Sequence, residues 1–282
     1  MTAAFVGAFA IAVTAFACSR GREPHAPGPV ASALISVSAD LGTSPTEVAN
    51  AWTELETIAA RIEARRTSPG KPGIDDFNAV VFDDLKFSRE IDDHDPRYFL
   101  WPSVIREKRG SCLGLGSLYL LLAERLGVPL EGVRLPGHFF VRTKGALPRN
   151  VELLRRGEAM PNAWYERKYG PRPEGNREFL RPLLVSELPS LFWFNAGNHA
   201  RAGGDLKGAL HAFENAVADA PDFAEAQASL GAIRHLEGEL PEAAAAYREA
   251  ERLRSDLPGL ERNMALLNEE QRKSESTRSP SP

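Results

Sequence analysis

The sequence predicts an α+β domain followed by an all-α helical-repeat domain. A strongly apolar stretch from Cys112 to Leu126 is followed by residues that alternate as strands do, which indicates a helix packed on a sheet. From residue 190 onward, small and aromatic residues recur with a period of 34, which indicates helical repeats. At 282 residues the chain is long enough for both domains. Its net charge of −4, with no concentrated basic face, argues against a nucleic-acid-binding protein.

The N-terminus has the features of an export signal. Residues 3–17 form an uncharged apolar run that ends at Cys18 and is too short to span a bilayer. The small residues before Cys18 resemble a bacterial lipoprotein processing box, so we expect residues 1–18 to be a signal peptide and Cys18 to carry a lipid anchor. The protein would then face the periplasm of a bacterial envelope; an uncleaved anchor, ordinary secretion or a misassigned start are the alternatives. Residues 19–40 are rich in Pro, Gly, Ala and Ser and predict a flexible tether.

The first domain is expected to cover residues 41–189 and to begin with a helix. Ser44 to Glu47 form a capping box with Pro45 at the first helical position, and apolar residues follow at helical spacing to about Arg66. Asp76 is expected to cap a short second helix. The acidic loop from Asp92 to Asp95 fits no calcium-binding spacing, so neither a metal nor another cofactor is expected.

Cys112 is predicted to lie in the first turn of a buried helix. Ser111 is a plausible N-cap, and Gly127 with Pro129 forms a stop signal at the other end. The free N–H groups and the positive end of the helix dipole favour a thiolate there, which would lower the cysteine pKa. If Cys18 carries lipid, Cys112 is the only remaining thiol and has no disulfide partner.

Chain lengths predict that His138 returns to Cys112. A helix from Cys112 to Leu126 is about 21 Å long, and an extended segment from Glu131 to His138 covers about 23 Å. A strand that doubles back along the helix therefore brings the imidazole within reach of the thiol, as in a nucleophile–base pair.

A second strand is expected to supply a group that orients the imidazole. His138, Phe140 and Arg142 share one face of their strand, and a turn after Lys144 leads to a strand that contains Asn150 and Glu152. Paired in even register, Asn150 or Glu152 becomes a direct or diagonal neighbour of His138. Either residue could accept a hydrogen bond from the ring, so both stay candidates for the third role.

These motifs resemble the bacterial branch of the transglutaminase-like superfamily over roughly residues 75–190. The resemblance rests on Ser-Cys-Leu-Gly-Leu at the helix start, Ala-Glu-Arg-Leu-Gly-Val-Pro at its end, Pro-Gly-His-Phe-Phe-Val-Arg on the strand, and Asn-Val-Glu after it. It implies a papain-like helix-plus-sheet domain whose catalytic Cys and His map onto Cys112 and His138. The family usually has Asp in the third position, where this chain offers Glu152, with Asn150 two residues earlier.

Two other interpretations of the same stretch are open. Gly110 to Gly114 match the Gly-x-nucleophile-x-Gly elbow of α/β-hydrolase-like enzymes, but the charged residues 106–109 stand where that elbow needs a buried strand. Alternatively the domain is a catalytically silent scaffold, in which Cys112 is only a small buried hydrophobe. Residues 155–182, which include Trp164, Tyr165 and Tyr169, are expected to form a long loop that walls a substrate cleft or covers the sheet.

The second domain is predicted over residues 190–272. Gly197 recurs as Gly231 and Phe213 as Tyr247, a pattern of small and aromatic residues typical of tetratricopeptide repeats, here 190–223 and 224–257. A capping helix is expected from Gly259 to Gln271 and a disordered tail over 273–282.

The combined prediction is an exported, thiol-dependent enzyme of the peptidase, amidase or acyl-transfer type. Its repeats would recruit a protein or peptide partner. Deletion of residues 190–282 is then expected to leave the chemistry at Cys112 intact.

Overall fold

The computed structural model describes residues 26–67, 69–91, 94–170 and 179–278. The predicted signal peptide, Cys18 and the first part of the predicted tether lie outside these residues, as do Asp92 and Asp93. Within the described ranges, no helix combines the length and apolar character that a membrane span requires.

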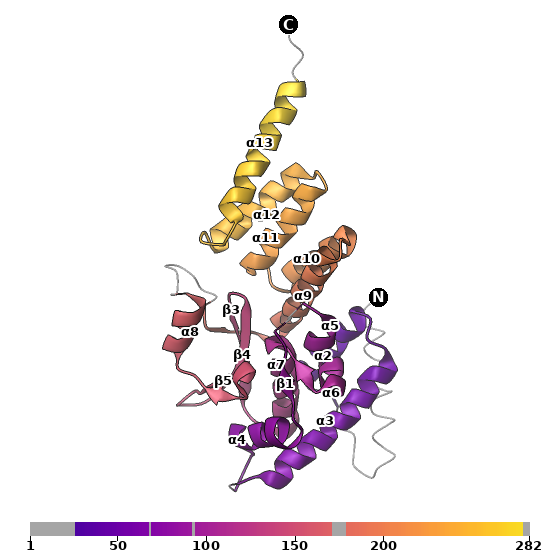
Figure 1. The fold of residues 1–282 in the computed structure, drawn as a ribbon, viewed down its shortest axis with the longest axis vertical. Coiled ribbons are helices and arrows are strands. Elements are labelled where there is room, and N and C mark those ends of the chain that lie inside the picture. Colours follow the sequence, from indigo (N-terminus) through magenta and orange to yellow (C-terminus); the bar gives the residue numbers. More distant parts are fainter. Residues whose placement is uncertain (1–25, 68, 92–93, 171–178, 279–282) are drawn as a thin grey trace.

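The central element is helix α7 (Cys112–Leu126), which lies between a sheet and a group of helices (Figure 1). Twelve consecutive residues of α7, from Cys112 to Ala123, are buried, because the helix contacts neighbours on all sides. The surrounding helices are α2 (Pro29–Asp40), α3 (Pro45–Arg65), α5 (Pro96–Phe99) and α6 (Trp101–Glu107). The predicted helix from Cys112 to Leu126 is confirmed as α7. Gly127, with φ 64°, is the C-cap residue that ends it.

The sheet has five antiparallel strands in the order β6-β5-β4-β3-β7. They are β3 (Leu130–Leu135), β4 (His138–Thr143), β5 (Asn150–Glu152), β6 (Glu158–Ala159) and β7 (Arg181–Pro182). Phe139 and Val141 of β4 belong to the core that contains α7, whereas Phe140 packs on the opposite face with α8 (Asn162–Tyr169). Strand alternation thus separates two cores, one on each side of the sheet.

The chain turns once more than the sequence prediction required. Leu135 pairs with His138 across a two-residue turn of Pro136 and Gly137, with Gly137 at φ 63°. His138 therefore begins a new strand rather than ending the one that starts near Glu131. His138 still lies at the Cys112 end of α7, because β3 runs back along the helix from its C-terminal end.

The remaining first-domain elements follow local signals. Ser44 and Glu47 form the expected capping box of α3. Asp76 lies inside α4 (Ile74–Asn78) rather than before it, and its carboxylate accepts the Gly73 N–H at 2.8 Å. α4 continues into η2 (Ala79–Asp84), a π-helix, and β1 (Ser88–Arg89) pairs in parallel with β2 (Arg109–Gly110). Two 3₁₀ turns complete the set: η3 (Leu153–Arg155) and η4 (Val185–Glu187).

The prediction of a flexible tether over residues 19–40 is wrong for its second half, which forms helix α2. Leu34 and Val37 are buried against the core, and Glu124 of α7 accepts hydrogen bonds from the N–H groups of Val30 and Ala31 at 2.8 and 2.9 Å. A carboxylate more than ninety residues away thus caps this helix, and no local sequence signal reveals such a partner.

The C-terminal region consists of two helical hairpins and a final helix, which extend as a column from the sheet domain (Figure 1). The helices are α9 (Leu188–Ala202), α10 (Leu206–Asp219), α11 (Ala224–Leu236), α12 (Leu240–Leu253) and α13 (Leu260–Arg278). A Cβ atom at Gly197 would overlap the ring of Phe213, and one at Gly231 would overlap Tyr247. The same close contact between a glycine and an aromatic ring therefore occurs in both hairpins, α9–α10 and α11–α12, 34 residues apart.

The predicted boundary at residues 189 and 190 falls inside a packed helix. Leu191 and Phe192 of α9 are buried in the first-domain core, and the Phe192 ring lies 6.2 Å from that of Phe99. α9 thus belongs to both parts of the molecule, so the expectation that residues 190–282 can be removed without damage is not supported by the packing.

The predicted disordered tail is also partly wrong, because α13 continues to Arg278. Lys273 forms an ion pair with Glu269 one turn earlier, at 2.6 Å. Charged pairs at this spacing can stabilise an exposed helical turn that has no apolar face. The low content of apolar residues after Lys273 therefore did not exclude a helix there.

Candidate active site

Cys112 occupies the first position of α7, as the sequence predicted. Ser111 caps the helix, and its Oγ accepts the Gly114 N–H at 3.4 Å. The Cys112 residue is buried, with 8% of its surface exposed, and it lines a cavity that is described below. Its own N–H forms no hydrogen bond within the described part of the chain, which is normal for a first-turn residue. That N–H is available as an oxyanion donor.

Gly114 fixes the position of the helix start. A Cβ at this residue would overlap the backbone carbonyl oxygen of Tyr98, and the Ser111 N–H donates to the same oxygen at 2.8 Å. Only glycine permits α5 to lie this close. The first turn of α7 is therefore held by backbone contacts rather than by flexible side chains.

His138 lies beside Cys112 at the start of β4 and is 7% exposed. Its Nε2 lies 2.8 Å from Oε2 of Glu152, which leaves Nδ1 as the ring nitrogen available to the thiol. Burial of the ring lowers the pKa of His138, but interactions with the Cys112 thiol and with Glu152 outweigh burial and raise it from 6.5 to about 9. The imidazole is therefore charged at neutral pH.

Glu152 is the third member of the group. It ends β5 and is 1% exposed, and its second oxygen, Oε1, accepts the Leu154 N–H at 3.2 Å. Both carboxylate oxygens are thus held, one by the backbone and one by His138. The strand register explains the geometry: Arg142 pairs with Asn150, so Glu152 lies on the same face two residues nearer to His138.

Asn150, the other candidate for the third position, does not contact His138. Its Oδ1 accepts from Arg142 Nε at 2.7 Å, and its Nδ2 donates to the carbonyl of Met160 and to Asn162 Oδ1. The amide thus joins β5 to Arg142 of β4 and to the start of α8. The expectation that Asn150 might orient the imidazole is therefore wrong, and the geometry selects Glu152.

Aromatic side chains from α8 cover the imidazole. The Tyr169 ring stacks on His138 with centroids 4.7 Å apart and an angle of 10°, and Tyr165 lies 6.2 Å away. Burial, with the nearby Glu152 carboxylate, raises the pKa of both phenols, so both are neutral over the physiological range. These rings shield the His138–Glu152 pair from water and thereby strengthen it.

The sequence placed Trp164, Tyr165 and Tyr169 in a loop that walls a cleft, but it did not predict α8 or the ring stacking. The available signal was the density of aromatic residues in 164–169. The sequence did not reveal that one of these rings stacks on His138. His138 and Tyr169 lie on different elements, β4 and α8, which only the folded domain brings together.

A cavity of about 320 Å³ opens onto the thiol–imidazole pair. Its lining includes Cys112, His138 and Glu152 together with the aromatic side chains of Trp164 and Tyr169. Arg89, Arg155 and Lys168 add positive charge at its edges. The cavity is large enough for a peptide-sized group at the sulfur, which is what an acyl substrate would require.

Comparison with known proteins assigns part of the chain to a family. Residues 49–187, which contain Cys112, His138 and Glu152, match the model of the transglutaminase-like superfamily. A UPF0162 protein of Xylella fastidiosa (strain 9a5c) is 38% identical over 116 residues, or 40% of this chain and 37% of that protein. F-box only protein 21 of Mus musculus is 36% identical over 70 residues, which cover 24% of this chain and 11% of that protein.

Two further similarities were found. Protein O-mannosyl-transferase TMTC1 of Mus musculus is 35% identical over 97 residues, which cover 34% of this chain and 10% of that protein. A solved structure described as "Crystal structure of menin reveals the binding site for Mixed Lineage Leukemia (MLL) protein" matches 88% of this chain and 70% of its own, with a TM-score of 0.45 and 13% identity. In each curated relative the matched part is thus well under half of the whole protein. Residues 49–187 form a transglutaminase-like domain, and a mostly helical region follows it.

Proposed function

We propose that this protein carries out thiol-dependent acyl chemistry on an amide, with Cys112 as nucleophile, His138 as general base and acid, and Glu152 as the residue that orients the ring. The observation that carries the proposal is the buried chain of contacts from Cys112 through His138 to Glu152. An imidazole that stays charged to about pH 9 beside a thiol at a helix start stabilises a thiolate. Asn150 has no part in this reaction.

The proposed reaction has two halves. The Cys112 sulfur attacks the amide carbonyl carbon, and the resulting oxyanion is met by the Cys112 N–H. Charged His138 then gives its proton to the amide nitrogen, the C–N bond breaks, and the amine leaves a thioester on the sulfur. Water or a second amine attacks the thioester while His138 accepts its proton, and the C–S bond breaks. Attack by water makes the protein a peptidase or amidase, and attack by an amine makes it a transferase.

Alkylation of Cys112 tests the proposal. The native protein and the same protein in urea are treated with iodoacetamide at pH 6, and modification of the Cys112 peptide is followed by mass spectrometry so that Cys18 does not interfere. At this pH an ordinary thiol is almost wholly protonated, so native Cys112 should react at least about tenfold faster than the unfolded chain. Slower reaction in the native state would favour a silent scaffold, whose buried thiol is simply sheltered.

For the rest of the chain the proposal is an anchored protein with a docking region. The repeated contacts of Gly197 with Phe213 and of Gly231 with Tyr247 support tetratricopeptide repeats, which would bind a protein or peptide partner. The apolar run before Cys18 supports a lipid anchor and a periplasmic location. Recovery of the partner by the full chain, but not by a variant with a disrupted repeat surface, would test the first part.

A further inference from the structure

The cavity at Cys112 carries uncompensated positive charge. Three cations line it from three different elements: Arg89 of β1, Arg155 of η3 and Lys168 of α8. Among the residues that the structure describes, the acidic ones that line the cavity are Glu90 and Glu152. Both are already engaged, because Glu90 lies 2.6 Å from Arg109 and Glu152 pairs with His138. The chain as a whole has a net charge of −4, so this local excess does not reflect its general composition.

Two of the three cations have no acidic partner. Arg155 pairs with Glu158 at 2.6 Å. In contrast, neither Arg89 nor Lys168 forms an ion pair with any residue that the structure describes. Lys168 Nζ lies over the rings of Trp164 and Tyr169, at 4.8 and 5.1 Å from their centroids. The two aromatic rings thus hold the ammonium group at the cavity without neutralising it.

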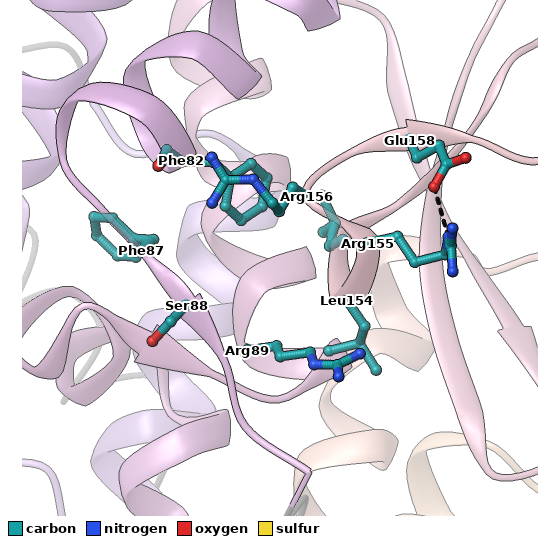
Figure 2. Close-up of a pocket in the computed structure, with 9 residues that line it drawn as sticks. Phe82, Phe87, Ser88, Arg89, Leu154, Arg155, Arg156 and Glu158 are labelled. Atoms are coloured by element: carbon teal, nitrogen blue, oxygen red, sulfur yellow. Dashed lines mark hydrogen bonds and ion pairs between the residues drawn. The ribbon is translucent and has the colours of Figure 1, made fainter.

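Arg89 also faces a second pocket, which adjoins the first. Arg89, Leu154 and Arg155 line both pockets, and Phe82 and Phe87 give the second one, of about 390 Å³, an apolar wall. Figure 2 shows the Arg89 side chain extending beside Leu154, whereas Arg155 turns away towards Glu158. A chain that leaves the sulfur along Arg89 therefore meets an apolar surface with a free guanidinium at its entrance.

From this arrangement we propose that the substrate is an acidic peptide, with a carboxylate side chain next to the reacting amide, and that Arg89 and Lys168 bind the carboxylate. A side chain of the glutamate type fits best, because its methylene groups can lie on the partly exposed Leu154 while its charge reaches Arg89. Guanidinium groups bind carboxylates with particularly favourable geometry. The inference rests on the proposed role of Cys112 as nucleophile.

Two alkylating reagents distinguish the effect of the cavity's positive charge on the reaction rate from the effect of thiolate formation at Cys112. Iodoacetate and iodoacetamide transfer similar groups to the same sulfur but differ in charge, so the ratio of their rates at Cys112 does not depend on how much thiolate is present. In the full chain, Arg89→Gln and Lys168→Gln should each lower the ratio of iodoacetate to iodoacetamide rates by about three- to tenfold, since each removes one nearby positive charge. Lys207→Gln, an exposed lysine of α10, is the matched control and should leave the ratio unchanged.

A peptide competition completes the test. Acetyl-Ala-Glu-Ala-amide should protect Cys112 from iodoacetamide at a concentration at least about fivefold lower than acetyl-Ala-Gln-Ala-amide does, and Arg89→Gln should abolish the difference. Equal protection by the two peptides, or a rate ratio unmoved by both substitutions, would overturn the acidic-peptide inference. Failure of the proposed function looks different: iodoacetamide would then modify native Cys112 no faster than the unfolded chain.

Discussion

Replacement of Glu152 by Gln isolates the charge that holds His138. Glutamine keeps the shape of the side chain, and its single amide oxygen can still accept the hydrogen bond from His138 Nε2. The NH2 group that replaces the other oxygen cannot accept from the Leu154 N–H, so that one backbone hydrogen bond is lost at every pH. What disappears is a negative charge 2.8 Å from the ring in a site where both side chains are almost completely buried. The imidazolium form should therefore lose most of its stabilisation, while the neutral form keeps its hydrogen bond.

The size of the effect follows from the pKa of His138, which rises from 6.5 to about 9 on folding. At about 1.4 kcal/mol per unit, the raised pKa corresponds to roughly 3 kcal/mol of stability, shared between Glu152 and Cys112. Because the folded-state pKa is the higher one, this stability is fully present below about pH 6.5 and is lost as the pH rises through 9. Glu152→Gln should thus lower the free energy of unfolding by about 1–3 kcal/mol more near pH 6.5 than at pH 10, where only the lost hydrogen bond to the Leu154 N–H, about 1 kcal/mol, remains.

Urea unfolding followed by tryptophan fluorescence between pH 6 and pH 10 measures this difference. Glu166→Gln, an exposed carboxylate of the neighbouring helix α8, controls for the general loss of one negative charge and should track the wild type. The reasoning is refuted if Glu152→Gln and wild type keep a constant separation across the whole range, or if the separation grows as the pH rises.

Four further outcomes are expected. His138→Ala should slow iodoacetamide alkylation of Cys112 at pH 6 by about tenfold or more, because it removes the positive partner of the thiolate; an unchanged rate would exclude His138 from activation. Gly114→Ala should lower the melting temperature and cost about 2–4 kcal/mol, since its Cβ would overlap the backbone carbonyl packed against the first turn of α7. Phe192→Ala should destabilise the transglutaminase-like domain by about 3–5 kcal/mol, although it lies in α9 of the C-terminal helical region, and a loss confined to that region would contradict the shared core. Mass spectrometry of the mature protein should find a lipid-modified Cys18 at its N-terminus, and a mature chain that begins elsewhere would exclude the anchor.

Local patterns in the sequence determined the elements that carry the chemistry. Ser111, the apolar run after Cys112 and Gly127 set both ends of α7, because caps and stops act within a few residues. The same holds for the capping box of α3 and for the repeated helix contacts at Gly197 and Gly231. The lengths of helix and strand, fixed by backbone geometry, were enough to bring His138 back to Cys112.

The tertiary structure alone decided the features that depend on partners far apart in the chain. Strand register gave the His138 contact to Glu152 and directed Asn150 to Arg142. A shift of the pairing by two residues keeps the same side chains on each face, so the alternation in the sequence does not exclude it. The cap that Glu124 provides for α2 likewise needs two segments whose proximity no local pattern encodes. The same holds for the stacking of Tyr169 on His138 and for the position of Arg89 at the cavity, where it has no ion-pair partner among the described residues. Both depend on which side chains the packed sheet and helices bring together, and local sequence preferences contain no information about that.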